Sequence, residues 1–225
     1  MTAERPRISN PKRNNLSLER FEIMEKGLII VVSGPAGSGK GTVNRHLLDT
    51  GKYVFSVSAT TRAPRPGEVD GVNYHFITEE DFKKMIETGE MLEYTYYSGN
   101  YYGTPKKEAL EVIESGRNLL LEIEVEGAMN IKKAYPEAVL IMLLPPGFKT
   151  QEKRLRGRGT ETEEKILARL ARTREEVVLL PNYDYVVYND DGCDVECAEE
   201  IEAIVFAEKR ATKRHPVAAK EYFEN

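Results

Sequence analysis

The chain has 225 residues, a mass of 25.5 kDa and a formal net charge of −5. This length favours one large domain, or a core with inserted lobes, over two independent domains. Hydrophobic residues make up 40% and charged residues 31% of the chain, a balance that is typical of soluble globular proteins and excludes a largely disordered or fibrous one. The acidic net charge argues against a general nucleic-acid-binding surface.

Membrane, secretory and disulfide-rich classes are also disfavoured. No stretch approaches the roughly 20 apolar residues that a membrane span needs, and the polar N-terminal residues lack the apolar core of a signal peptide. Two cysteines, Cys193 and Cys197, cannot form a disulfide framework, and the three histidines are too scattered to complete a zinc site with them. We therefore expect a cytoplasmic protein with neither membrane nor nucleic-acid partners; the sequence does not indicate its oligomeric state.

Apolar runs predict the central strands in chain order. Residues 1–26 contain prolines and lack apolar periodicity, so we expect a flexible arm. Residues 28–32 are continuously apolar, which is typical of a strand buried on both faces. Similar runs follow at residues 119–125, 139–144 and 185–188, separated by helix-length segments. This alternation predicts an α/β fold with a doubly wound parallel sheet.

Turn and capping residues divide the rest of the chain. One helix is expected to open at Thr78 and stop at Gly89, the next runs from Pro105 to Gly116, and Pro136 ends a third.

Strand-like segments between the helices predict an inserted lobe over residues 57–106, which contains a small, mostly antiparallel sheet. A glycine-rich break at residues 157–160 predicts a short mobile lid at about 148–165. The core then comprises residues 27–56 and 107–215, and residues 216–225 form a C-terminal tail.

A phosphate-binding loop follows the first strand directly. The loop fits G-x-x-x-x-G-K and consists of Gly34, Pro35, Ala36, Gly37, Ser38, Gly39, Lys40, Gly41 and Thr42. Its backbone N–H groups, the N-terminus of the next helix and the Lys40 ammonium all favour a bound phosphate. Gly41 stands where Ser or Thr usually follows the lysine, so Thr42 either binds Mg²⁺ directly or leaves that contact to water. The context predicts a P-loop site for a nucleoside triphosphate.

A proline-bounded loop at the start of the inserted lobe is the candidate second site. Arg62 and Arg65 can each hold a phosphate with two parallel hydrogen bonds, and Glu68 follows them. The residues alone leave open a simple solvated turn.

Several motifs in matching order give this chain a family resemblance. They are Ser-Ala-Thr-Thr-Arg at 58–62, Asn-Tyr-His-Phe at 73–76, Gly-Asn-Tyr-Tyr-Gly-Thr at 99–104, Arg-Gly-Arg-Gly at 156–159 and Asn-Asp-Asp at 189–191. From about residue 27 to about residue 210 the chain resembles the guanylate kinases. The resemblance implies phosphoryl transfer from ATP to GMP or dGMP, giving ADP and GDP, with Mg²⁺ accompanying ATP.

The same resemblance implies roles for individual residues. Lys40 and the lid arginines Arg154, Arg158 and Arg169 are expected to be catalytic, and Asn189 to border the adenine. The residues expected to bind GMP are Ser58, Arg62, Arg65, Glu68, Tyr74, Glu93, Tyr102, Thr104 and Glu124.

Three glutamates replace other residues at the family's metal-side segment. The segment around Glu122, Glu124 and Glu126 is similar to one that carries two aspartates and a glutamine. Each extra methylene displaces a carboxylate by about 1.5 Å. Glu122, together with Thr42, is expected near Mg²⁺ through nucleotide and water. Among the basic residues near the expected lid, Lys149, Arg156 and Arg172 are interpreted as ordinary solvated charges.

Two alternatives remain at this point. A nucleoside monophosphate kinase of other base specificity would share the phosphate loop, but Ser58, Glu93 and the 99–104 motif argue against it. A catalytically silent guanylate-kinase-like module that binds a phosphorylated protein would lose Lys40 or the lid arginines, and these are present.

Overall fold

The computed structural model describes residues 26–97, 99–157, 159 and 162–215. The arm expected over residues 1–26, apart from Lys26, lies outside these ranges, as do Arg158 and the expected tail. Within the described ranges, no helix is both long enough and apolar enough to cross a membrane.

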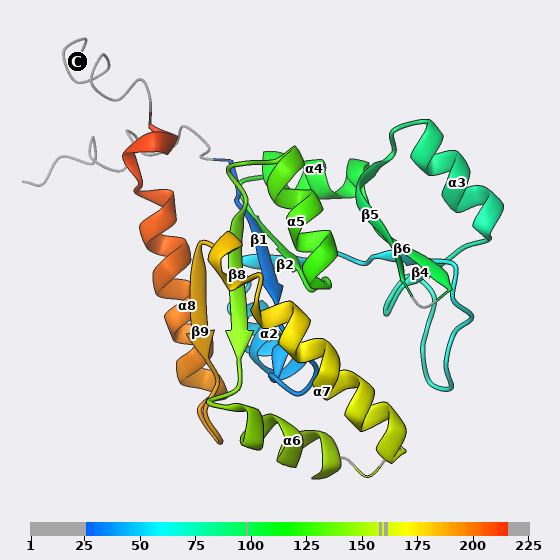
Figure 1. The fold of residues 1–225 in the computed structure, drawn as a ribbon. Helices are drawn as coiled ribbons and strands as arrows, with labels where there is room; N and C mark the ends of the chain where they lie inside the picture. The colour runs from blue at the N-terminus through cyan, green and yellow to red at the C-terminus, as the bar shows by residue number, and fades with distance from the viewer. Residues whose placement is uncertain (1–25, 98, 158, 160–161, 216–225) are drawn as a thin grey trace, which may run out of the picture.

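A five-stranded parallel sheet forms the centre of the molecule (Figure 1), with the strand order β2-β7-β1-β8-β9. The strands are β1 (Ile29–Ser33), β2 (Tyr53–Phe55), β7 (Asn118–Leu121), β8 (Val139–Leu144) and β9 (Tyr185–Tyr188). The predicted doubly wound α/β fold is confirmed, because helices cover both faces of this sheet.

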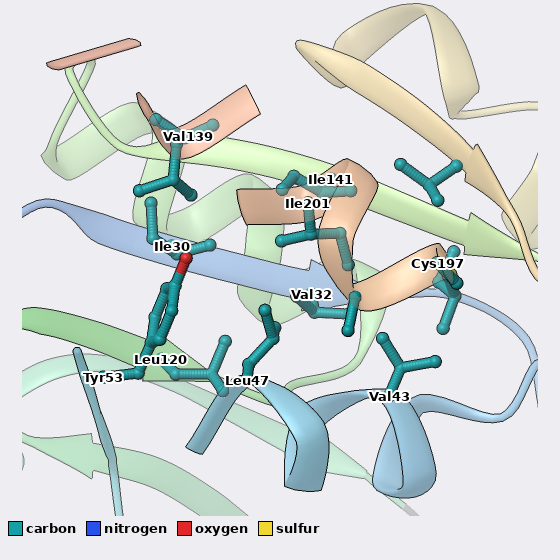
Figure 2. Close-up of a cluster of buried hydrophobic side chains, with 14 of the residues drawn as sticks. Ile30, Val32, Val43, Leu47, Tyr53, Leu120, Val139, Ile141, Cys197 and Ile201 are labelled. Atoms are coloured by element: carbon teal, nitrogen blue, oxygen red, sulfur yellow. The ribbon is translucent and has the colours of Figure 1, made fainter. Parts of the chain in front are cut away.

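Alternate residues of β1 point to the two faces. Ile30 and Val32 pack with α2 (Lys40–Asp49) and α8 (Asp194–Lys209), and Figure 2 shows this cluster around Leu47. The neighbouring β1 residues pack on the other face with α4 (Lys106–Glu114) and α5 (Val125–Ala134). Because both faces are covered, every residue of β1 is buried.

One strand prediction was wrong in extent. The apolar pattern predicted a strand continuing to Val125, but β7 ends at Leu121 and Val125 begins α5. Alternating Glu122, Ile123 and Glu124 resembles a strand, yet Glu124 is the extended residue that precedes the helix. Val125 is buried beside Met142 and Leu144 from the first turn of α5, and this packing favours the helix. The two glutamates before it therefore lie where the chain leaves the carboxyl end of the sheet.

A second, four-stranded sheet has the order β4-β3-β6-β5. Its strands are β3 (Ala59–Thr60), β4 (His75–Phe76), β5 (Met91–Tyr97) and β6 (Asn100–Pro105), and β6 is antiparallel to both β3 and β5. Helix α3 (Glu79–Glu87) belongs to the same region, and Thr78 caps it by accepting a hydrogen bond from the Asp81 amide at 3.1 Å. Strand β6 passes directly into α4, so no linker separates this sheet from the core.

Two further helices, α6 (Phe148–Gly157) and α7 (Glu163–Val177), flank the glycine-rich break. They lie side by side below the carboxyl end of the central sheet (Figure 1). Leu155, Ile166 and Leu170 form a small apolar cluster that packs against Ala36 of the phosphate loop. Short 3₁₀ turns at Leu180–Asn182 and Thr212–Arg214 complete the described structure.

Candidate active site

The phosphate loop connects β1 to α2 in a conformation that depends on its glycines. Gly34, Gly37 and Gly39 have φ values of 148°, 84° and 94°, in the region that favours glycine. A Cβ atom on Gly34 would lie 2.1 Å from the carbonyl oxygen of Leu143 on β8. The loop is therefore pressed against the sheet, with the N-terminus of α2 behind it.

Polar groups of the loop are available for a ligand. Lys40 Nζ donates to the Gly34 carbonyl at 2.5 Å, so its ammonium lies across the loop. The buried Ser38 Oγ has no hydrogen-bond partner in the part of the chain that the structure describes. A buried hydroxyl without a partner is costly, and a phosphate oxygen would satisfy it.

Asn189 closes the side of the loop expected to face the donor base. Its Nδ2 donates to the Ser38 carbonyl at 2.9 Å, whereas its Oδ1 is buried without a partner among the described residues. Beside it lies an open cleft of about 360 Å³, whose lining includes Gly37, Thr42 and Arg154. This cleft can hold a flat base next to the phosphate loop.

The loop at residues 61–68 is organised around Glu68. One oxygen of its carboxylate accepts from Arg62 Nη2 at 2.9 Å, and the other accepts from the Arg65 amide at 2.7 Å. These hydrogen bonds, that from Arg62 first, lower the pKa of Glu68. Arg62 is thereby fixed over the ring of Tyr74, 5.5 Å from its centroid, and the Arg65 side chain remains exposed. These contacts order the two ends of the loop, while residues 63–67 between them remain exposed.

Tyr74 and Tyr102 meet edge to face, with ring centroids 6.1 Å apart. Both side chains are half-buried, and burial raises the pKa of Tyr74. The negative charge of Glu122, which follows β7, acts on the pKa of Tyr74 in the same direction. Arg62, Tyr74 and Tyr102 thus form one cluster in this lobe.

Glu93 and Thr104 form a buried pair on β5 and β6. Thr104 Oγ1 donates to Glu93 Oε1 at 2.9 Å, and the two residues are 7% and 0% exposed. Burial raises the pKa of Glu93 to about 7, although the hydrogen bonds from Thr104 oppose the rise. The packing around the carboxylate is close, because a Cβ on Gly127 would lie 3.0 Å from Glu93 Oε2. Ser58, whose carbonyl accepts from the His75 amide, precedes β3 of the same sheet.

The two residues expected near Mg²⁺ lie beside different parts of the first turns of α2, Glu122 beside Asn44 and Thr42 in the lining of the donor cleft. Glu122 accepts a hydrogen bond from Asn44 Nδ2 at 2.7 Å, which fixes its carboxylate beside α2. Thr42 is exposed on the first turn of α2. In the described part of the chain, no group of three or more His, Cys, Asp and Glu side chains is arranged to hold a metal by itself. An ion here would therefore depend on oxygens from nucleotide and water.

The lid arginines differ in their surroundings. Arg154 on α6 donates to Asp191 Oδ1 at 2.8 Å and to the Asn189 carbonyl at 2.9 Å, so it already lies beside the donor cleft. Arg169 is exposed on α7. Arg158 lies outside the described residues, so its placement stays a prediction.

Arg172 is not the ordinary solvated charge that its sequence context suggested. Its guanidinium lies 4.1 Å from the ring centroid of Tyr97 on β5, and its Nε donates to the buried Glu176 at 2.9 Å. Its Nη2 is also 3.7 Å from Glu124 Oε2. Arg172 thus bridges α7, the small sheet and the segment before α5. The pairing with Glu176 is local, four residues further along α7, but Tyr97 and Glu124 come from two segments that are distant in sequence and carry no local signal for the contact.

Comparisons with known proteins agree with this arrangement. The guanylate kinase family model matches residues 26–208. A guanylate kinase of Clostridioides difficile is 49% identical over 85% of this chain and 93% of its own length, and one of Halalkalibacterium halodurans is 53% identical over 82% and 90%. A crystal structure of guanylate kinase from Anaplasma phagocytophilum matches with a TM-score of 0.68 and 34% identity, covering 84% of this chain and 90% of that one. On the order of its motifs, its fold and these matches, the chain belongs to the guanylate kinase family.

Proposed function

We propose that this chain transfers the γ-phosphoryl group of ATP to GMP, or to dGMP, and releases ADP and GDP. Family membership supports the reaction class. The observation that carries the choice of acceptor is the buried Glu93–Thr104 pair on the same small sheet as the Arg62–Tyr74–Tyr102 cluster. A carboxylate accepts the two donors, N1–H and N2–H, on the edge of guanine, while the cluster holds the acceptor's phosphate.

The proposed acceptor needs no general base. A GMP phosphate oxygen is already ionised, so catalysis consists of positioning and of stabilising charge in the transition state. Lys40 and the loop amides act on the donor phosphates, and Arg62 and Arg65 orient the acceptor phosphate. Arg154, Arg158 and Arg169 are proposed to stabilise the transferring group.

Mg²⁺ is the proposed cofactor. Thr42 and Glu122 offer the oxygen ligands that Mg²⁺ prefers, and the unpartnered Ser38 Oγ of the phosphate loop is consistent with a bound nucleotide. When bound with ATP, Mg²⁺ neutralises part of the charge on the β- and γ-phosphates. Few protein ligands suffice, because Mg²⁺ usually keeps several water molecules.

The proposed functional parts correspond to the two sheets and to the pair of helices α6 and α7. Residues 27–56 and 107–215 form the ATP-binding core, residues 57–106 the GMP-binding lobe, and residues about 148–165 the lid. Glu124 and Glu68 belong to the acceptor side, Glu68 by holding Arg62 rather than by contact with GMP. The proposed substrates are cytoplasmic nucleotides, so the proposal places the enzyme in the cytoplasm.

A substrate panel tests the proposed function. ADP release is measured with ATP and Mg²⁺ against GMP, dGMP, AMP, CMP and UMP, and product GDP is identified by chromatography. We expect strong activity with GMP and almost none with AMP, because adenine presents an N1 acceptor to the acceptor oxygens of Glu93. Equal rates with AMP and GMP, or no transfer to any of the five, would contradict the proposal.

A further inference from the structure

A buried glutamine joins the phosphate loop to both lid helices. Gln151, on α6, is 1% exposed, and its Nε2 donates to the Ala36 carbonyl at 2.8 Å and to Thr173 Oγ1 at 2.7 Å. Ala36 belongs to the phosphate loop and Thr173 to α7. One amide group therefore connects three segments that are distant in sequence.

The connection continues to the arginine-bearing part of α7. Thr173 Oγ1 donates to the carbonyl of Arg169 at 3.0 Å, so the hydroxyl both accepts from Gln151 and donates along its own helix. Arg154 lies on the same helix as Gln151. The two helices that carry the proposed lid arginines are thus tied to one loop carbonyl.

The surroundings of this amide are otherwise apolar. Leu155, Ile166 and Leu170 form a cluster that packs on Ala36, and Thr173 continues the spacing of the last two along α7. An apolar side chain at 151 could fill the same space, and a polar one is tolerated in such surroundings only when it is hydrogen-bonded. Core packing alone does not require a glutamine, and its two hydrogen bonds suggest a positional role.

The bond to Ala36 fixes one peptide plane of the phosphate loop. In a trans peptide the carbonyl of Ala36 and the N–H of Gly37 point in opposite directions. Because Gln151 holds the carbonyl toward the lid helices, the Gly37 N–H points away from them. Gly37 belongs to the phosphate loop, where such an amide can bind a phosphate oxygen.

We propose that Gln151 is a positioning residue for the donor site. It orients the Ala36–Gly37 peptide toward the phosphates of ATP and holds α6 and α7 in position against the phosphate loop. The inference rests on the proposed function and adds a residue to it. Loss of Gln151 weakens ATP binding about five- to tenfold, as expected for one orienting hydrogen bond, and lowers kcat. Binding of GMP is unaffected, because among the described residues the hydrogen bonds of Gln151 go to the phosphate loop and to α7 rather than to the acceptor lobe.

Gln151→Leu, which keeps a similar volume, removes both hydrogen bonds. The dissociation constant of ATP is measured by displacement of a fluorescent ATP analogue in the absence of GMP, and KM for each substrate and kcat are measured in the transfer assay. Lys149→Gln, an exposed change on the same helix, serves as the matched control and is expected to leave ATP binding unchanged.

The double variant Gln151→Leu/Thr173→Val separates positioning from stability. It replaces both side chains of the hydrogen-bonded pair by apolar ones of similar shape beside the Leu155–Ile166–Leu170 cluster, so its thermal midpoint should lie closer to that of the wild type than the midpoint of Gln151→Leu does. A positioning role predicts that its ATP dissociation constant nevertheless stays about five- to tenfold raised. If ATP affinity recovers together with stability, or if folded Gln151→Leu binds ATP as the wild type does, the proposal is overturned.

The measurement of ATP binding also distinguishes a failure of the role proposed for Gln151 from a failure of the proposed function. A wild-type protein that binds ATP but does not phosphorylate GMP would contradict the proposed function, while the ATP affinities would still decide the role of Gln151.

Discussion

Glu93→Gln should stabilise the nucleotide-free protein while weakening its use of GMP. The carboxylate is buried, and burial raises its pKa to about 7 from an ordinary 4.5. Glutamine keeps the size of the side chain, and its carbonyl oxygen can still accept the hydrogen bond from Thr104. The change therefore removes the ionisation of a buried group without leaving a cavity.

The magnitude and its sign follow from linkage. Below pH 4.5 glutamate is protonated in both the folded and the unfolded chain, so it carries no penalty. As the pH rises from 4.5 to 7, the unfolded state ionises while the folded state stays largely protonated, so the folded state loses stability relative to the unfolded one; above pH 7 the difference no longer grows. The difference of about 2.5 pKa units corresponds to about 3 kcal/mol at pH 8. The glutamine of Glu93→Gln does not ionise, so the variant does not lose this stability. Its free energy of unfolding should exceed that of the wild type by near zero at pH 4.5 and by about 3 kcal/mol at pH 8.

Urea unfolding of the two proteins without nucleotide, at intervals from pH 4.5 to pH 8.5, measures this advantage. A difference in unfolding free energy that does not vary with pH would refute the reasoning, because it would mean that Glu93 does not titrate in this range. Thr104→Val is a useful comparison, since it removes the donor that stabilises the charged carboxylate and should raise the pKa of Glu93 further.

Glu93→Gln also tests guanine recognition. Replacing one acceptor oxygen by an NH₂ group leaves a guanine donor unpaired, at a cost of about 1–3 kcal/mol in kcat/KM for GMP. In the wild type, GMP binding at pH 7 should release about half a proton, because the bound base requires the ionised form. Calorimetry in buffers of different ionisation enthalpy measures that release. An unchanged ratio of GMP to AMP activity in Glu93→Gln would remove this residue from the base site.

Three further outcomes concern the donor loop and the bridge at Arg172. Lys40→Met should reduce kcat by orders of magnitude with little change in thermal midpoint, because a charge complementary to the transition state is lost; near-normal kcat in the folded variant would contradict its role. Gly34→Ala should abolish ATP binding, because the new Cβ would lie 2.1 Å from a β8 carbonyl, whereas Gly41→Ala, with open space around it, should bind ATP normally. Arg172→Leu should cost about 1–3 kcal/mol, since it leaves the buried Glu176 without its guanidinium donor; urea unfolding measures the loss, and an unchanged midpoint would show that the bridge is not stabilising.

The sequence predicted helices and strands correctly where a local pattern determines the structure. Strands β8 and β9 have the predicted bounds because they are uninterrupted apolar runs, and Thr78 caps α3 as its side chain predicts. Pattern failed at Val125, where tertiary packing overrides an apparent strand alternation. For the candidate site, the motifs select residues that the structure gathers into two clusters, but their individual roles remain predictions.

Contacts between segments that are distant in sequence could not be predicted from local patterns. Nothing local shows that Arg172 meets Tyr97, since the meeting depends on how α7 is placed against the small sheet. The sequence does carry a signal for Gln151 and Thr173. Gln151 has helical spacing with Leu155, and Thr173 with Leu170, so each polar residue falls on an apolar helix face. That spacing indicates buried polar groups, but only the fold shows that they meet each other and the phosphate loop.

The position of the small sheet within the chain has a consequence for folding kinetics. Strands β1 and β7 are neighbours in the central sheet, yet the entire insertion lies between them in sequence. The β5–β6 hairpin pairs residues close in sequence and so can form early, and β3 then pairs with β6 near the two ends of the insertion. Once these ends are joined, the chain between β1 and β7 behaves as a much shorter loop, and each halving of its effective length lowers the closure cost by about 0.6 kcal/mol. Early folding of the insertion therefore assists the long-range pairing on which the central sheet depends.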